Sequence, residues 1–327
     1  MKHILIVGAG AVGQVYGYQF AQAGNQVSFL VKEKYQQQLA KGLTLYHLNR
    51  DKHKKRPIQF REFAILTDWQ QVKAKAQTQP WDQIYFCISS TAFMNFDFSG
   101  LQQALSPDTT VVILQSGPKD FELAAQHVPE SQLVQGMITL VSYSAPLPGE
   151  PGEQLIQPGI AYWLPPIAAT PFAGNPSRRT DIVNTFKRAN MNANSNPKLR
   201  EMAPYPTAAL MAFLTALEAS DWQFDRLKAN KPLQREMLKA QQQAFQALSK
   251  DTQTKPPIWH HLIKAWLLNL LFGLAPKVVP LDLESFFKVH FTKVKDQTKL
   301  YMDTYIKAAE SHGITATELV ALNRLTD

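Results

Sequence analysis

The residues best suited to chemistry in this chain lie near its start, in a run of small residues. The run reads Gly8-Ala9-Gly10-Ala11-Val12-Gly13. It follows an apolar, strand-like segment, residues 4–7, and opens a segment with helical periodicity, residues 11–23. In that context a G-x-G-x-x-G run is typical of a loop that binds the diphosphate of a dinucleotide.

Each glycine of this run has its own physical task. Gly8 permits a tight turn, Gly10 lets the backbone approach the diphosphate, and Gly13 lets the helix pack closely on the strand. The backbone N–H groups at the helix start, around Ala11 and Val12, then face the phosphates, and the helix dipole favours their negative charge. The glycine run is therefore predicted to be the cofactor site.

The residue at the end of the second strand indicates which dinucleotide is bound. Enzymes that use NAD usually carry Asp or Glu there, which binds the ribose 2′-hydroxyl. This chain has Lys32 after a strand predicted over residues 26–31, and Glu33 follows. A lysine can pair with the 2′-phosphate of NADP, whereas a carboxylate would repel it. Lys32 therefore favours NADP, and a shift of one position, to Glu33, leaves NAD open. The first 33 residues are expected to form one βαβ unit.

Strands and helices alternate through the first half of the chain. Two more short apolar runs, residues 84–88 and 111–114, are typical of strands buried in a parallel sheet. Residues 101–105 and 121–125 are expected to be connecting helices. Prolines and glycines then crowd residues 146–175, which excludes a long helix and leaves room for a short edge strand over residues 159–164.

The second half of the chain has helical patterning throughout. Helices are expected over residues 182–189, 207–222, 233–248, 258–274 and 293–312. The fold class predicted is therefore α/β, with an N-terminal Rossmann dinucleotide-binding domain, residues 1–172, and a C-terminal all-helical domain, residues 173–327. The longest apolar stretch, residues 258–275, contains Lys264 and Asn269, so a buried helix is favoured over a membrane span.

The basic character of the chain does not by itself indicate nucleic-acid binding. The net charge is +8, and the densest basic run, residues 50–56, lies between strand-like segments at 43–48 and 58–66. No aromatic residue interleaves with the run to stack on bases, so a solvated hairpin tip is favoured. The positive charge would instead steer an anionic cofactor and substrate toward the protein. Neither nucleic acid nor a membrane is expected as a partner.

The cysteine and histidine content limits the remaining chemistry. The single cysteine, Cys87, lies in an apolar run, so there is no disulfide framework, and a reducing, cytoplasmic compartment is expected. A buried thiol of this kind is more often a small hydrophobic residue than a nucleophile. No H-E-x-x-H, C-x-x-C or G-x-S-x-G pattern occurs, so no metal site is expected.

The strand–glycine run–helix start, Lys32 and the helical second half together resemble the ketopantoate reductase (2-dehydropantoate 2-reductase) family. The resemblance implies NADPH as cofactor and reduction of the 2-keto group of ketopantoate, the chemistry of pantothenate biosynthesis. It also implies a substrate in the cleft between a Rossmann domain and a helical domain, and a helical domain able to supply dimer contacts. By position it places Ser89 and Ser116 in the cofactor site, where the family carries a lysine and an Asn-Gly pair.

The chain departs from the family at the catalytic positions. A glutamate that stands two residues before Asp303 in the family is replaced here by Tyr301. The family's lysine and two asparagines at the first long helix of the second domain are also replaced, by Pro204, Ala208 and Ala212. A keto-acid reductase needs a proton donor near the developing alkoxide, and Tyr301 or Tyr205 is a candidate substitute. Otherwise the catalytic residues are left unassigned.

Two functions remain open from the sequence. The first is an NADPH-dependent oxidoreductase that acts on a 2-keto acid or a related small carbonyl compound. The second is a catalytically inactive NADP-binding sensor or partner-binding protein, which the missing catalytic residues favour. A homodimer is open in either case.

Overall fold

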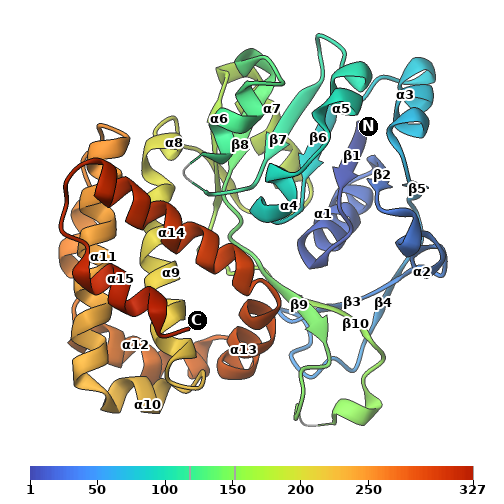
Figure 1. The fold of residues 1–327 in the computed structure, drawn as a ribbon. Helices are drawn as coiled ribbons and strands as arrows, with labels where there is room; N and C mark the ends of the chain where they lie inside the picture. Colours follow the sequence, from blue (N-terminus) through green and yellow to red (C-terminus); the bar gives the residue numbers. More distant parts are fainter. Residues whose placement is uncertain (118, 151, 327) are drawn as a thin grey trace. The chain divides into compact units, whose positions relative to one another are not determined.

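A computed structural model describes residues 1–117, 119–150 and 152–326 (Figure 1). The chain forms two compact units, Met1–Arg200 and Glu201–Asp327, called unit 1 and unit 2 below. Unit 1 contains all the strands of the described residues, and unit 2 is helical. The predicted class, an α/β Rossmann domain followed by a helical domain, is confirmed.

The main sheet of unit 1 has eight strands in the order β12-β11-β8-β7-β6-β1-β2-β5. Their bounds are β1 His3–Val7, β2 Gln26–Leu30, β5 Ala64–Leu66, β6 Gln83–Phe86, β7 Thr110–Ile113, β8 Leu133–Gly136, β11 Thr170–Gly174 and β12 Ala193–Ser195. All neighbouring strands pair in parallel except β8 and β11. The chain leaves β1 toward β2 and β5 and later crosses back to β6, so the direction of winding reverses between β1 and β6. Such a switch point is where open α/β sheets bind ligands.

The apolar strands are explained by cores on both faces of this sheet. In β6, Tyr85 packs into one core with Tyr16 and Phe186, whereas its neighbours Ile84 and Phe86 pack into the other. The first core lies under α1 (Ala11–Gln22) and α7 (Pro176–Arg188), and the second under α3 (Trp69–Thr78), α4 (Ser90–Met94), α5 (Phe98–Ala104) and α6 (Asp120–Ala125). Because successive side chains point to opposite faces, a strand covered on both faces must be apolar throughout.

A second sheet of four strands corrects two expectations. Its order is β4-β3-β10-β9, with β3 Leu43–His47, β4 Ile58–Phe60, β9 Val141–Ala145 and β10 Gly159–Trp163. The strand expected over residues 58–66 breaks at Arg61, and its second part is β5 of the main sheet. The strand expected at an edge, β10, is internal, because it pairs with β3 on one side and with β9 on the other.

The basic run at residues 50–56 is only partly the solvated hairpin tip that was expected. The antiparallel pairing of β3 with β4 confirms the hairpin. Lys54, however, is buried, with its ammonium in an ion pair with Glu150 and 5.6 Å from the centre of the Tyr143 ring. A carboxylate and an aromatic face from distant parts of the chain offset the cost of burying this charge.

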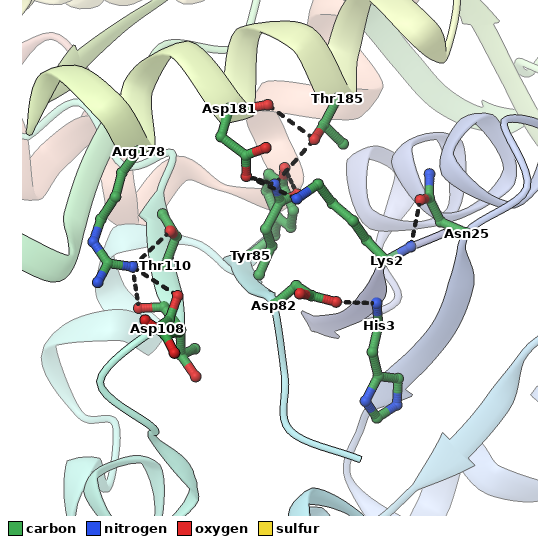
Figure 2. Close-up of polar contacts among 12 residues, drawn as sticks. Lys2, His3, Asn25, Asp82, Tyr85, Asp108, Thr110, Arg178, Asp181 and Thr185 are labelled. Carbon is green, nitrogen blue, oxygen red and sulfur yellow. Dashed lines mark hydrogen bonds and ion pairs between the residues drawn. The ribbon is translucent and has the colours of Figure 1, made fainter.

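The division between the units lies between Arg200 and Glu201, later than the boundary expected near residue 172. Residue 172 falls inside β11, and the helix that follows, α7, is bound to the sheet by polar side chains (Figure 2). Asp181 of α7 accepts hydrogen bonds from Lys2 and Gln83, both at 2.9 Å. On the same helix, Arg178 donates to three main-chain carbonyls and a hydroxyl in the segment from Pro107 to Thr110. This helix therefore completes the Rossmann unit.

Unit 2 is a set of helices packed around a core of its own. Its helices are α9 Pro204–Glu218, α10 Phe224–Ala229, α11 Lys231–Asp251, α12 Ala265–Val278, α13 Leu283–Lys293, α14 Lys295–Ser311 and α15 Thr317–Arg324, and the short α8, Leu199–Met202, spans the division. The long helix α11 packs against α9, α14 and α15 (Figure 1). Side chains such as Tyr205, Met237 and Tyr305 fill the core between them.

The apolar segment at residues 258–274 is not the buried helix that was expected. It forms a short 3-10 turn, Ile258–Leu262, followed by α12, and Trp259, Leu268 and Phe272 pack against the core of unit 2. Leu262 and Trp266 are 64% and 67% exposed. Some of the segment's apolar side chains therefore pack on the core of unit 2, while others are exposed. Within the described residues, no helix combines the length and apolarity that crossing a membrane requires.

Candidate functional site

The glycine run forms the turn between β1 and α1, at the switch point of the sheet. Gly8 has a φ of +97°, which favours glycine, and its N–H donates to the carbonyl of Leu30 at 2.9 Å. A Cβ on Gly8 would lie 2.9 Å from the carbonyl oxygen of Cys87, just after β6. The loop after β1 thus lies directly against the loop after β6, and only a glycine fits between them.

Gly10 and Gly13 have opposite surroundings. A Cβ on Gly13 would lie 2.1 Å from the carbonyl oxygen of Gly8, so the helix can approach the turn only without a side chain there. A Cβ on Gly10 would have no atom within 4 Å, and Gly10 is exposed. Space is therefore open above the backbone at Gly10, where a dinucleotide-binding loop admits the diphosphate.

The N-terminus of α1 is left available to an anion. Gly10 is its N-cap residue, and no side chain caps the helix within the described part of the chain. The side-chain amide of Gln14 holds the loop by donating to the carbonyl of Ala9 at 2.8 Å. Ala11 and Val12 follow in the first turn and are half-buried. Uncapped N–H groups at the positive end of a helix can bind a phosphate.

Lys32 is the first exposed side chain after β2. The strand ends at Leu30, Val31 is buried, and Lys32 precedes a 3-10 turn that begins at Glu33. Both Lys32 and Glu33 are exposed, and neither has a side-chain hydrogen bond or ion pair with another described residue. Both side chains are therefore available to bind a ligand. After the strand end, the first exposed side chain is therefore a lysine and the second is a carboxylate.

Ser89 and Ser116 lie in the loops after β6 and β7, the two strands beside β1 on one side. Ser89 caps α4, where its hydroxyl accepts from the N–H of Ala92 at 3.2 Å and lies 2.9 Å from the Thr91 hydroxyl. Ser116 is half-buried. Since parallel strands end at the same edge of a sheet, both loops lie on the edge that carries the glycine run.

Two residues that the sequence analysis missed join these loops. The Gln115 amide donates to the carbonyls of Phe86 and Ile88, at 3.2 and 2.7 Å. The buried carboxylate of Asp120 accepts from the Ser90 hydroxyl at 2.7 Å and from the Gly117 N–H at 2.8 Å. The only sequence signal was a polar residue at the end of an apolar strand and an acid at a helix start.

Cys87 is placed as expected for an inert thiol. It follows β6, its N–H donates to the carbonyl of Val7 at 2.9 Å, and its side chain packs beside the core under α1. Burial raises the pKa of the Cys87 thiol far above its usual value. The thiolate is therefore scarce at neutral pH, and Cys87 is unsuited to nucleophilic chemistry.

The candidate proton donors of unit 2 are structural residues. Tyr205 and Tyr301 lie in the core with exposed fractions of 0% and 3%, and the Tyr205 hydroxyl is 2.9 Å from that of Thr254. Neither tyrosine can contact a substrate without repacking of the core. The positions aligned with the family's lysine and asparagines are also buried, at Pro204, Ala208 and Ala212. Among the described residues, no group of three or more His, Cys, Asp or Glu side chains could hold a metal ion.

Comparison with known proteins bears on the first half of the chain and on its fold. Residues 4–151 match the family described as ketopantoate reductase PanE/ApbA. The sequence has no match among curated proteins.

Solved structures resemble the whole chain at low sequence identity. A 2-dehydropantoate 2-reductase from Geobacter metallireducens GS-15 is 15% identical, with a TM-score of 0.72 over 99% of this chain and 98% of its own. A PanE/ApbA family ketopantoate reductase from Ralstonia eutropha JMP134 is 16% identical, with a TM-score of 0.74 over 99% and 96%. D-mandelate dehydrogenase, solved with NADH and anilino(oxo)acetate, is 13% identical, with a TM-score of 0.72 over 99% and 96%. At such identities the likeness is one of fold.

Proposed function

Because residues 4–151 match the family described as ketopantoate reductase PanE/ApbA, we propose that this chain is an NADPH-dependent reductase of a 2-keto acid or a related carbonyl compound. The observation that carries the proposal is the open space above Gly10 at the uncapped start of α1. NADPH supplies a hydride to the carbonyl carbon when it is bound. The chain's part is to bind the diphosphate at α1, with Lys32 at the 2′-phosphate and Ser89 and Ser116 as further polar contacts.

The choice of substrate class follows from the names of the similar structures. 2-Dehydropantoate, mandelate and anilino(oxo)acetate are all 2-oxo or 2-hydroxy acids or close derivatives of them. The choice of NADPH over NADH rests on this chain alone, because D-mandelate dehydrogenase was solved with NADH. Here the first exposed side chain after β2 is a lysine, which favours a phosphate over a free hydroxyl.

Titration of the purified protein with NADPH and NADH by calorimetry tests the cofactor site. We expect NADPH to bind more tightly, and Lys32→Glu to weaken it about 10- to 100-fold, since a hydrogen bond to a charged group contributes about 1.5–3 kcal/mol. Lys34→Glu is the matched control, because it changes the net charge equally from an exposed position over the Tyr35 ring. If NADPH affinity falls equally in both variants, Lys32 acts only through long-range electrostatic attraction. If the wild-type protein binds neither NADPH nor NADH, the proposal is refuted.

A second function is favoured by the residues that replace the family's catalytic groups. With Pro204, Ala208, Ala212 and Tyr301 buried in unit 2, the chain would bind NADP without reducing a carbonyl compound and would act as a sensor or partner-binding protein. Mixing the NADPH complex with a panel of 2-keto acids separates the two functions. Oxidation of NADPH by any of them supports the reductase, whereas tight binding without turnover supports the sensor.

The cellular setting is part of the same proposal. We expect a reducing, cytoplasmic compartment, because the one cysteine of the chain is free and its thiol is inert. Cell fractionation with an antibody to the protein checks this expectation. A small carbonyl compound is the expected partner.

A further inference from the structure

One face of α12 is left uncovered by the core of unit 2. Four exposed side chains at intervals of four residues form a single row along this face, called the α12 face below: Trp266, Leu270, Leu274 and Val278. Among the exposed residues of α12 that the structure describes, Lys277 is the only polar one. A continuous apolar surface with a polar rim marks a contact with another protein or with a membrane.

The opposite side of α12 holds this row in place. Leu268 and Phe272 pack against the core of unit 2, and the Phe272 ring is stacked on that of Phe224 at 5.1 Å. Asn269, on the same side, accepts a hydrogen bond from the side-chain amide of Gln234 at 3.0 Å. The helix is therefore folded before it meets a partner, so binding through the α12 face requires no ordering of the main chain.

The segment that contains this face has basic residues and no acidic ones. No Asp or Glu occurs in residues 252–281, although the whole chain contains 26. The same segment has three exposed lysines that form no ion pair with a described residue: Lys255, Lys264 and Lys277. The two acids that border the segment are engaged, because Asp251 lies 3.5 Å from His312 and Asp282 caps α13. A partner for the α12 face must therefore combine an apolar layer with negative charge.

A lipid bilayer with anionic headgroups combines these two properties. Its hydrocarbon accepts apolar side chains, and its headgroups attract nearby lysines. Tryptophan is enriched where headgroups meet hydrocarbon, and Trp266 is 67% exposed in the row. A second copy of this chain fits less well, because its own α12 face would bring the same lysines and no acid to pair with them. The net charge of +8 acts in the same direction, since it attracts the chain to an anionic surface and repels another copy.

From these features we propose that unit 2 binds the surface of an anionic phospholipid bilayer through the α12 face. The apolar row enters the boundary between headgroups and hydrocarbon, and α12 lies along the membrane surface. Lys264, directly before α12, and Lys277, in its last turn, pair with lipid phosphates at the two ends of the row. The sequence argued against a membrane span, whereas a contact at the surface leaves Lys264 among the headgroups and Asn269 bonded to Gln234. The proposal does not rest on the reductase activity, because it uses no residue of the cofactor site.

Flotation of the full chain with lipid vesicles tests the proposal. We expect the chain to float with vesicles made of equal parts of phosphatidylcholine and phosphatidylserine, and to bind vesicles of phosphatidylcholine alone much more weakly. High salt should weaken the binding, because it screens the lysines. Absence of binding to the mixed vesicles, or equal binding to both kinds, would overturn the proposal.

An acidic residue in the row tests the contact with the hydrocarbon. Leu270→Glu should weaken binding to the mixed vesicles about tenfold or more, since the burial of a leucine is lost and the lipids repel the new charge. Ile167→Glu is the matched control, because Ile167 is exposed in unit 1 and the net charge changes equally. Both variants should keep the wild-type melting temperature, because neither side chain is buried. If both weaken vesicle binding equally, net charge alone attracts the chain and the α12 face has no part in it.

The lysines at the ends of the row are tested as a pair. Lys264→Gln combined with Lys277→Gln should weaken binding about fivefold for each lysine. Lys187→Gln combined with Lys198→Gln is the control, because it removes the same charge from exposed positions of unit 1 and should have little effect. Equal losses in the two pairs would refute the assignment. All four of these proteins should bind NADPH as the wild type does, so a failure of vesicle binding is distinct from a failure of the cofactor site.

Sedimentation of the chain without lipid tests the other occupant of the face. We expect the α12 face to make no contact between copies, so the wild type and Leu270→Glu should sediment with the same mass. A wild-type dimer that becomes a monomer in Leu270→Glu would show that a second copy covers the face, and the proposal of a membrane surface would be wrong.

Discussion

At the scale of single residues, we expect Gly13 to be required for folding and Gly10 to be required for binding of the cofactor. Gly13→Ala would force a Cβ to within 2.1 Å of the Gly8 carbonyl oxygen, a contact that only a backbone shift can relieve. We expect a loss of about 1–3 kcal/mol of stability, typical of overpacking, and a melting temperature lower by several degrees in thermal unfolding followed by circular dichroism. Cofactor binding should weaken as well, because the turn moves.

Gly10→Ala is the matched comparison, since its Cβ meets nothing within 4 Å and its φ of −69° suits any residue. It should leave the melting temperature unchanged and lower NADPH affinity, because the methyl group occupies the space required by the diphosphate. A melting temperature that falls equally in both variants would contradict this division of roles.

At the scale of elements, the loops after β6 and β7 act as one piece because Asp120 joins them. Its Oδ2 atom accepts a hydrogen bond from the Ser90 hydroxyl in α4 and another from the Gly117 N–H before α6. Because both donors reach the same oxygen, the amide of Asp120→Asn can still accept both, but without the charge. A hydrogen bond to a charged group contributes about 1.5–3 kcal/mol, against about 0.5–1.5 kcal/mol for a neutral one, so both bonds should weaken. We expect NADPH affinity to fall about tenfold, measured by calorimetry, as Ser89 and Ser116 lose their relative placement.

Asp97→Asn provides the control for charge. Asp97 caps α5 by accepting from the N–H and hydroxyl of Ser99, and asparagine can replace it in that role. NADPH binding should be unchanged in this variant. If Asp120→Asn also binds NADPH normally while the wild type binds it tightly, the joined loops do not take part in the cofactor site.

At the scale of the whole molecule, the two units have separate cores, and α7 belongs with the first. A fragment of residues 1–200 should therefore fold cooperatively, as followed by denaturant unfolding. A fragment of residues 1–172 should not, because it loses Ile182 and Phe186 from the core and the hydrogen bonds of Arg178 and Asp181 to the sheet (Figure 2). Cooperative unfolding of the shorter fragment would contradict the placement of the division.

Local patterns predicted the first elements of the fold well. The strand before the glycine run, the helix after it and the strand before Lys32 end within about a residue of their expected bounds, because caps and buried runs depend on neighbouring residues. The break at Arg61, the internal position of β10 and the late division have no local signal. They depend on which distant segments pair, and β3 with β10 is such a pair.

The sequence by itself determined a dinucleotide-type turn, its glycines and the lysine that follows the second strand, because the spacing of these residues along the chain sets their chemistry. Only the tertiary structure decided what lies around them. Asp120 and Gln115 join the loops of the candidate site. Lys54 is buried with Glu150 as its partner, and Tyr205 and Tyr301 lie in the core of unit 2. The role of a polar side chain depends on how deeply it is buried and on which groups it bonds. Both are set by segments that lie far away in the sequence, so neither can be read from the neighbouring residues.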